Sequence, residues 1–338
     1  MKILVDLNEE LFNRIKEVNK NYTLQNFILI AIENQVTLEK EEDLDLSKRM
    51  KSLSKEQYDP AERNVLENKK PKQPATIIKV LNNPLDFDKI IPISLKKPLK
   101  NYYIWGQYNK FFAIKFAVRN LALMQIKNNF SPVRLDEYQI ECAKEASKMK
   151  NILIESDTKA NRKWGEVFAS GLPEDEEKSH SRFIHHFIGY VDSKGNPVGA
   201  LSDLGFVVIE NEQIALSPFG LEFAKLKNPV IDENPFSPTL FSQVEREFLI
   251  NHIKNNISIE WKGMTTVVQW IQSGFITPDS LNEKMATMDS KWTDKMANTY
   301  RTGMLARMFD LGFISRKKIG VNVNYIITDF AKKVVEIV

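Results

Sequence analysis

The chain contains an internal repeat that begins with the residues Asp-Leu-Gly-Phe. One copy occupies residues 203–224 and the other residues 310–335. In both copies the shared tetrapeptide is followed by an apolar residue, a polar turn, a second short apolar run and a segment with helical spacing. The polar part of the second copy is four residues longer. Because a spaced pair of such patterns is far less expected by chance than a single one, we predict two similar structural units.

The order of residues within each copy predicts its local structure. Gly205 and Gly312 can end a helix, because glycine adopts the left-handed backbone conformation without steric cost. The short apolar runs on either side of the polar turn predict a β-hairpin. Ser217 and Thr328 stand where the N-cap of a helix belongs. Each copy is therefore expected to contain the end of a helix, a hairpin and a capped helix.

This order of elements resembles that of winged-helix domains, over residues 105–228 and 240–338. The resemblance implies that the hairpin is the wing and that the helix before each glycine is, or runs into, the recognition helix. The paired endings also resemble the recognition halves of some type IIS restriction and nicking enzymes, which stack winged-helix units. Those enzymes add a separate nuclease domain, for which this chain has no room.

The two copies differ in charge. The residues around the first glycine include one cation, Lys194, and the acids Asp192 and Asp203, and its hairpin carries two glutamates. Residues 291–318 contain seven cations and two acids. Lysine and arginine neutralise phosphates, and asparagine and arginine can make bidentate contacts to base edges. We predict that the second unit binds DNA through Lys291, Lys295, Asn298, Thr299, Arg301, Thr302, Arg307, Arg316, Lys317 and Lys318.

The first 36 residues form a separate pattern of one strand and two helices. Alternating apolar residues predict a strand over 3–7, and helical spacing follows, with a break at residues 21–22. This layout resembles the ribbon-helix-helix family over residues 2–36, whose members are obligate dimers. The resemblance implies that two chains pair here. The dimerisation residues would be Ile3, Val5, Leu7, Leu11, Ile15, Phe27, Ile28 and Ile32.

The whole chain is predicted to be mostly helical with small β-hairpins, in the α+β class. Of its 338 residues, 43% are apolar and 27% charged, which is ordinary for a folded protein. Two long helices are predicted, over 108–128 with apolar residues on most sides and over 134–155. The predicted organisation is a dimerisation module (1–45), a linker or arm (46–100), a first winged-helix-like domain (101–230) and a second winged-helix domain (237–338).

The sequence offers little catalytic chemistry. Glu260-x-Lys262 follows a short strand-like run at 257–259 and is the nearest match to a nuclease pattern, but Glu-x-Lys is common in charged chains. The histidines lack the carboxylate spacing of a zinc site. Cys142 lies on a predicted helix beside other apolar residues and is expected to pack in the core. We expect no catalytic residue, no bound metal and no cofactor.

These features predict a non-enzymatic, sequence-specific protein that binds double-stranded DNA as a homodimer. A transcriptional regulator or a DNA-recognition factor of a mobile element or defence system would fit, and a plasmid or phage replication or partition factor is an alternative. A winged-helix protein-interaction scaffold is a further alternative, because the first hairpin is acidic. The single cysteine and the lack of an 18-residue apolar run predict a cytoplasmic protein with no membrane partner.

Overall fold

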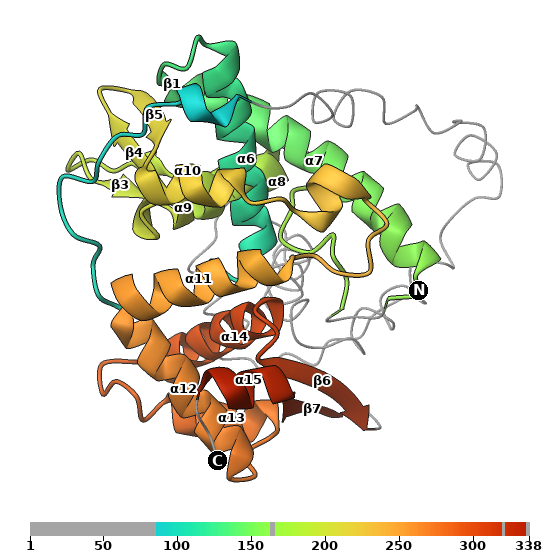
Figure 1. Ribbon diagram of the computed structural model, residues 1–338. Helices are drawn as coiled ribbons and strands as arrows, with labels where there is room; N and C mark the ends of the chain where they lie inside the picture. Colours follow the sequence, from blue (N-terminus) through green and yellow to red (C-terminus); the bar gives the residue numbers. More distant parts are fainter. Residues whose placement is uncertain (1–85, 163–165, 320–321, 336–338) are drawn as a thin grey trace, which may run out of the picture. The chain divides into compact units, whose positions relative to one another are not determined.

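The computed structural model describes residues 86–162, 166–319 and 322–335. All of them belong to one of two compact units of the chain, Pro71–Val338. The predicted dimerisation module, with all eight of its named residues, and most of the predicted arm lie outside the described residues. The described part is mostly helical with small antiparallel sheets, which agrees with the predicted class (Figure 1).

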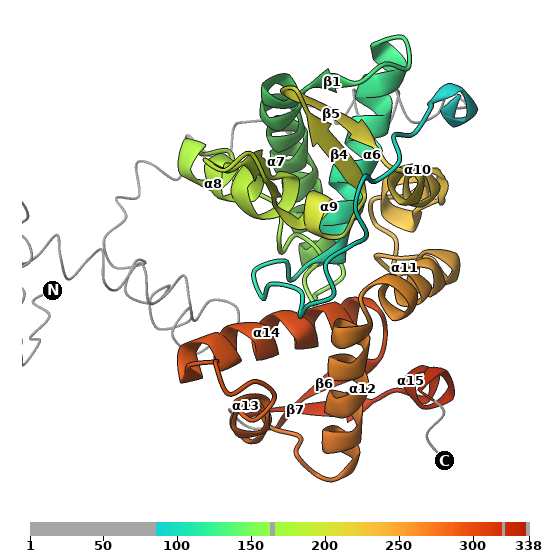
Figure 2. The ribbon, with the colours of Figure 1, turned by 90° about the vertical axis from the view of Figure 1, so that its left-hand side faces the viewer.

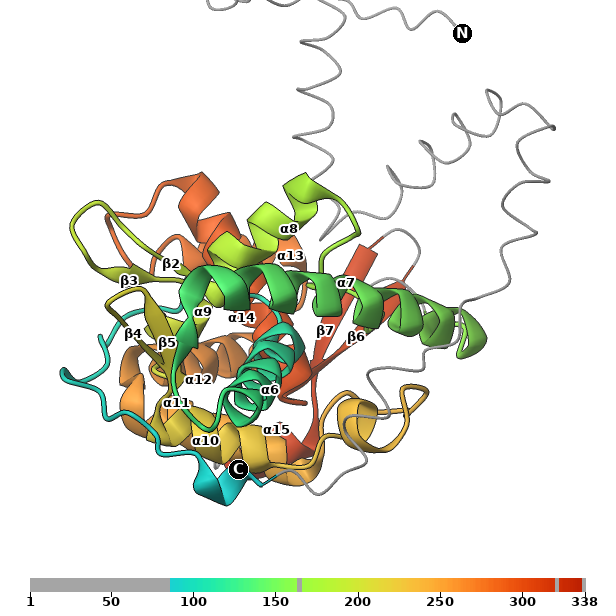
Figure 3. The ribbon, with the colours of Figure 1, turned by 90° about the horizontal axis from the view of Figure 1, so that it is seen from above.

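The first half, residues 86–226, is built around one central helix, α6 (Phe111–Lys127), most of which is buried. This confirms the predicted apolar helix. The second long helix, α7 (Leu135–Lys159), lies against α6 and is seen along its full length in Figure 3. The other elements of this half are η1 (Phe87–Lys89), β1 (Val133–Arg134), α8 (Glu177–Phe183), the π-helical turn η2 (Ile184–Ile188), β2 (Tyr190–Val191), β3 (Pro197–Val198), α9 (Ala200–Asp203), β4 (Val207–Glu210), β5 (Gln213–Leu216) and α10 (Pro218–Lys225).

Three of these strands form an antiparallel sheet in the order β1-β5-β4. Strand β1 comes directly before α7, so the sheet ties the start of α7 to the hairpin. Val133 pairs with Ile214 in this sheet, and both are buried. On α7, Cys142 is also buried, as predicted. The neighbouring Tyr138 donates a hydrogen bond to the carbonyl of Ala117 in α6 at 2.7 Å, which fixes α7 against the central helix.

The second half, residues 240–335, follows the π-helical turn η3 (Pro229–Glu233). Its long helix α14 lies between the first half and a two-stranded hairpin (Figure 2). A backbone hydrogen bond from Tyr325 to Ile276 joins the hairpin to the loop before α13 at 2.8 Å. The elements are α11 (Gln243–Asn256), α12 (Ser258–Gln272), α13 (Pro278–Met285), α14 (Asp294–Asp310), β6 (Ile314–Ile319), β7 (Asn322–Ile327) and α15 (Asp329–Val334).

The sequence repeat corresponds to a structural repeat with the same hydrogen bonds. Gly205 and Gly312 have φ angles of +69° and +78°, as the predicted left-handed helix ends require. The hydroxyl of Ser217 donates to the carbonyl of Gly205 at 2.5 Å, and that of Thr328 donates to Gly312 at 2.6 Å. Each hydroxyl also accepts a backbone N–H of the following helix, α10 or α15. Both predicted hairpins and both predicted N-caps are therefore confirmed.

The aspartate that opens each copy contacts the chain around the start of α6. The hydroxyl of Tyr108 donates to Asp203 at 3.0 Å, and the backbone N–H of Phe111 donates to Asp310 at the same distance. Because both carboxylates are largely buried, burial raises the pKa of each above its ordinary value. The two copies are thus joined through one short stretch of chain, residues 108–111. We call the segment that precedes α6, residues 99–110, the connector.

The helix before the glycine differs between the copies. In the second copy it is α14, with 17 residues. In the first copy α9 has only four residues, and the hairpin of β2 and β3 separates it from α8 and η2. The helix predicted to end at Gly205 is therefore present, but it is much shorter than α14. The strand-like run predicted at 257–259 is wrong, because these residues enter α12.

Candidate nucleic-acid interface

The N-terminal half of α14 presents polar side chains to solvent. Thr293 caps the helix, its hydroxyl oxygen accepting a hydrogen bond from a backbone N–H of the first turn at 3.3 Å. Lys295 and Asn298 are exposed and Thr302 is partly exposed. Spacings of three and four residues place these three on one face of the helix. Lys291, which precedes the helix, is exposed as well.

A second side of α14 packs against the connector. A Cβ atom at Gly303 would overlap the backbone of Gly106, and a Cβ atom at Gly106 would overlap the carbonyl of Thr299. The Thr299 hydroxyl donates to the carbonyl of Lys295 at 2.9 Å. The backbone carbonyl of Thr299 therefore lies at an internal contact, while the residue stays partly exposed, as Thr302 does.

Arg307 was predicted to contact DNA, but its side chain is fully buried. Its Nη2 atom lies 2.7 Å from Oε1 of Glu260, whose side chain is equally buried. The guanidinium also donates to the carbonyls of Ile104, Trp105 and Tyr108 at 3.1–3.4 Å. A group enclosed in this way cannot reach a phosphate or a base edge, so this residue is removed from the predicted site.

Arg301 is also buried, at 3% exposure. Its Nη2 atom donates to the side-chain oxygen of Asn298 at 2.6 Å. This hydrogen bond holds the exposed Asn298 amide in place, while Arg301 itself does not lie on the surface. The sequence pattern predicts Arg301 and Arg307 as surface charges, because spacing along α14 does not show which side of the helix the connector covers.

The hairpin of β6 and β7 carries three predicted cations that do not share one face. Arg316 is partly buried, and its guanidinium lies 5.0 Å from the ring centre of Phe309. Lys317 and Lys318 are exposed. Because neighbouring strand residues point to opposite faces, these two lysines lie on opposite sides of the hairpin. Lys317 pairs with Asn324 across the two strands.

Fewer of the predicted DNA-binding residues are therefore exposed than the sequence indicated. Five of the ten residues are exposed, and three more are partly exposed, namely Thr299, Thr302 and Arg316. The five exposed residues come from the segment before α14, from the first turns of α14 and from the hairpin, and they are Lys291, Lys295, Asn298, Lys317 and Lys318.

An aromatic cluster beside this surface was not predicted as a unit. The rings of Trp292 and Tyr300 are stacked with centres 4.3 Å apart, and Tyr103 and Trp105 of the connector meet them edge-on. The cluster fixes the start of α14 against the connector. No helical spacing marks this cluster in the sequence, because Trp292 precedes α14 and the connector residues Tyr103 and Trp105 are distant along the chain.

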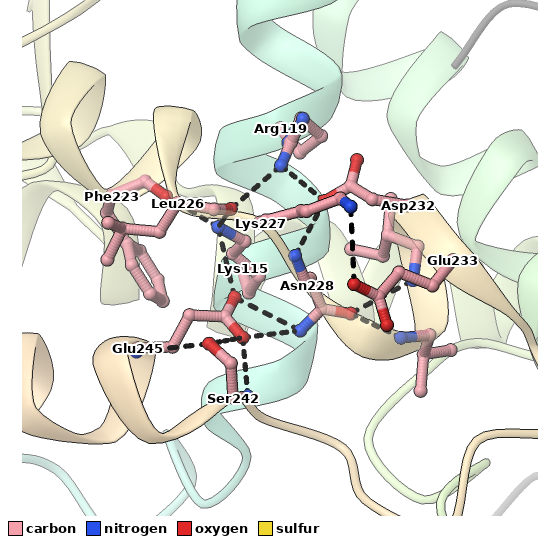
Figure 4. A network of polar contacts seen from close by, with 12 residues as sticks. Lys115, Arg119, Phe223, Leu226, Lys227, Asn228, Asp232, Glu233, Ser242 and Glu245 are labelled. Atoms are coloured by element: carbon pink, nitrogen blue, oxygen red, sulfur yellow. Dashed lines mark hydrogen bonds and ion pairs between the residues drawn. The ribbon is translucent and has the colours of Figure 1, made fainter. Parts of the chain in front are cut away.

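A buried polar network joins α6 of the first half to η3 and to α11 of the second half (Figure 4). Lys115 and Arg119 of α6 pair with Glu245 at 3.1 Å and Asp232 at 2.6 Å, and both cations also bind the carbonyl of Leu226. Burial lowers the pKa of Lys115 to about 8, although Glu245 acts in the opposite direction. The signal in the sequence was the presence of two cations inside an otherwise apolar run.

The described residues contain no group of three or more His, Cys, Asp or Glu side chains placed to hold a metal ion. Glu260, the carboxylate of the nuclease alternative, is paired with Arg307, while Lys262 is exposed. The two residues therefore do not come together in a site. Burial raises the pKa of the Cys142 thiol to about 12, so this thiol is not activated as a nucleophile.

Comparisons with protein-family models, with curated proteins and with solved structures found no match to this chain. Among the described residues, no helix combines the length and the apolar character needed to span a bilayer.

Proposed function

We propose that this protein consists of two winged-helix units arranged in tandem and binds double-stranded DNA through the second of them. The observation that carries the proposal is that the order of helix end, left-handed glycine, hairpin and capped helix occurs twice in the structure. The second copy also carries exposed cations. In this assignment α14 is the reading helix and the β6–β7 hairpin is the wing. The first copy, with its short α9 and acidic hairpin, supports the second rather than reading DNA.

The proposed contacts divide into two kinds. Lys295, Asn298 and Thr302 share the exposed face of α14 and would face the major groove, where an asparagine amide can bind adenine. Lys317 and Lys318 lie on opposite faces of the hairpin and would neutralise phosphates on either side of it. Lys291 would add a phosphate contact near the start of the helix. Arg301 acts only indirectly, by holding the Asn298 amide.

We further propose that the protein acts as a dimer joined by residues 1–45, on the strength of the sequence pattern alone. A two-fold dimer would bind two half-sites related by symmetry. Deleting residues 1–36 is expected to halve the mass measured by light scattering, and an unchanged mass would contradict the dimer module. Transcriptional regulation, DNA recognition in a mobile element or defence system, and replication or partition all remain compatible with such a protein.

The sequence preference can be tested by selecting bound duplexes from a randomised DNA pool. Asn298→Ala should cost about 1–3 kcal/mol on the preferred duplex and relax the preference at one base position. Asn324→Ala in the hairpin provides a matched control, which should keep the base preference. If no duplex is enriched by the unmodified protein, the DNA proposal fails and the interaction-scaffold alternative is favoured.

A further inference from the structure

A groove lies between α10 and α11, away from the exposed cations of α14. The two helices lie side by side in Figures 1 and 2, and the cavity between them has a volume of about 360 Å³. This volume falls in the range of sites that accept a ligand or a set of anchoring side chains. The groove belongs to neither hairpin and has no part in the proposed DNA contacts.

Its walls are two helix faces with helical spacing. The α11 wall includes Val244, Glu247, Phe248 and Asn251, at intervals of three and four residues, and continues to Asn255. Val244 is 58% exposed, which is high for a valine within a helix. This wall is therefore an amphipathic helix face that no described part of the chain covers fully.

The α10 wall has the same character. Phe219, Glu222 and Leu226 line the groove at intervals of three and four residues. Phe219 and Leu226 are only partly buried, and Glu222 is exposed. The two walls together contribute four apolar side chains, those of Phe219, Leu226, Val244 and Phe248, and one carboxylate from each helix.

The charge of the groove has one sign. Glu222 and Glu247 are its charged side chains, and none of the described residues that line it is a lysine or an arginine. His252 donates its Nε2 proton to the carbonyl of Leu204 at 2.8 Å, and burial lowers the pKa of its ring. This shift favours the neutral ring over the charged one. A phosphate backbone would be repelled here.

We propose that this groove binds a basic amphipathic helix of a partner protein. Aliphatic side chains of that helix would cover Val244, Phe248 and Leu226, and its lysines or arginines would pair with Glu222 and Glu247. This is the helix-in-groove mode of recognition, in which anchors at intervals of three and four residues enter an apolar channel. The proposal is independent of DNA binding and adds a protein partner to it.

The test uses the full chain and two synthetic peptides of roughly 18 residues, long enough to form a helix. One peptide carries leucines at helical spacing with lysines on its flanks, and the other replaces every lysine with glutamate. Amide hydrogen exchange is measured with and without each peptide. The lysine peptide should slow exchange in 219–226 and 244–256, and the glutamate peptide should not. Equal protection by both peptides, or protection elsewhere only, would overturn the proposal.

Variants then separate a specific groove from general attraction to negative charge. Glu247→Lys and Val244→Asp should each weaken binding of the lysine peptide by about tenfold or more, whereas the matched changes Glu283→Lys on α13 and Ile140→Asp on α7 should alter it less than about twofold. Unfolding curves verify that each variant is folded. If the control variants lose as much peptide affinity, the proposal is contradicted. It is also contradicted if the protein self-associates with rising concentration and Val244→Asp abolishes this association, because a second copy of the chain would then occupy the groove. DNA affinity should not change in Glu247→Lys.

Discussion

Arg307 and Glu260 form an ion pair in which neither side chain is exposed, with 2.7 Å between Nη2 and Oε1. The second oxygen of Glu260 accepts the backbone N–H of Ile104 at 2.9 Å, and Arg307 binds three carbonyls of the same stretch. The pair therefore joins α12 and α14 to the connector. The two residues therefore stabilise the packing inside the protein and are not part of an exposed surface.

Removing one partner of this pair should be strongly destabilising. Arg307→Met leaves the Glu260 carboxylate buried without its cation, and we expect a loss of about 3–5 kcal/mol in the free energy of unfolding. The double variant with methionine at both positions should recover much of that loss, because no unpaired charge remains. Urea unfolding measures both. A single variant as stable as the unmodified protein would contradict the buried pair.

The N-cap hydroxyls of the two repeat copies should contribute similar amounts to the free energy of unfolding. Ser217 and Thr328 each cap a helix and each bind the glycine carbonyl that precedes their hairpin. Replacing either with alanine should cost about 1 kcal/mol, within a range of 0.5–2. Thr328→Ser keeps the oxygen and is the matched control. If Thr328→Ser is as destabilising as Thr328→Ala in thermal unfolding, the lost hydroxyl is not the cause.

The close approach of Gly303 and Gly106 makes α14 sensitive to a single methyl group. Gly303→Ala would force a Cβ into the connector backbone, and we expect a destabilisation of about 1–3 kcal/mol. Thr302→Ala, one position away on the exposed face, should change the free energy of unfolding by less than about 0.5 kcal/mol. Equal effects of the two changes in urea titrations would show that the connector does not pack there.

Lys115 predicts a pH dependence of stability with a definite sign. Its pKa is about 8 in the folded protein, below the ordinary value of 10.5. Between these values the unfolded chain binds more protons, so the contribution of Lys115 to folding becomes more favourable as pH rises through this interval. The stability of the unmodified protein relative to Lys115→Met should therefore increase from pH 8 to pH 10. A decrease would mean that the Glu245 attraction dominates and the pKa is raised.

Local structure in the repeat followed from the sequence because it depends on neighbouring residues. A glycine that needs a positive φ, a hydroxyl at an N-cap and two short apolar runs are all local signals, and both copies fold as these signals indicate. The central helix α6 was predicted for the same reason, because its apolar residues extend around most of its circumference.

Which cations lie on the surface could not be predicted from the sequence, because burial depends on contacts between residues that are distant along the chain. Arg307 and Lys295 are both cations on α14, yet one is enclosed by residues 104–108 and the other is exposed. No spacing within α14 could distinguish them without knowledge of the connector. The short length of α9 was not predicted, because the two-residue strands β2 and β3 that precede it give almost no periodic signal.

The most direct test of the DNA account is the salt dependence of duplex affinity for the unmodified protein and for Lys317→Gln/Lys318→Gln. The logarithm of the association constant should fall linearly with the logarithm of salt concentration, and the double variant should have a slope shallower by about 1.8, corresponding to two phosphate contacts. Lys144→Gln on α7 should leave the slope unchanged. Binding that is absent or insensitive to salt, or an equal change in slope for Lys144→Gln, would contradict the assignment of the hairpin as a DNA contact.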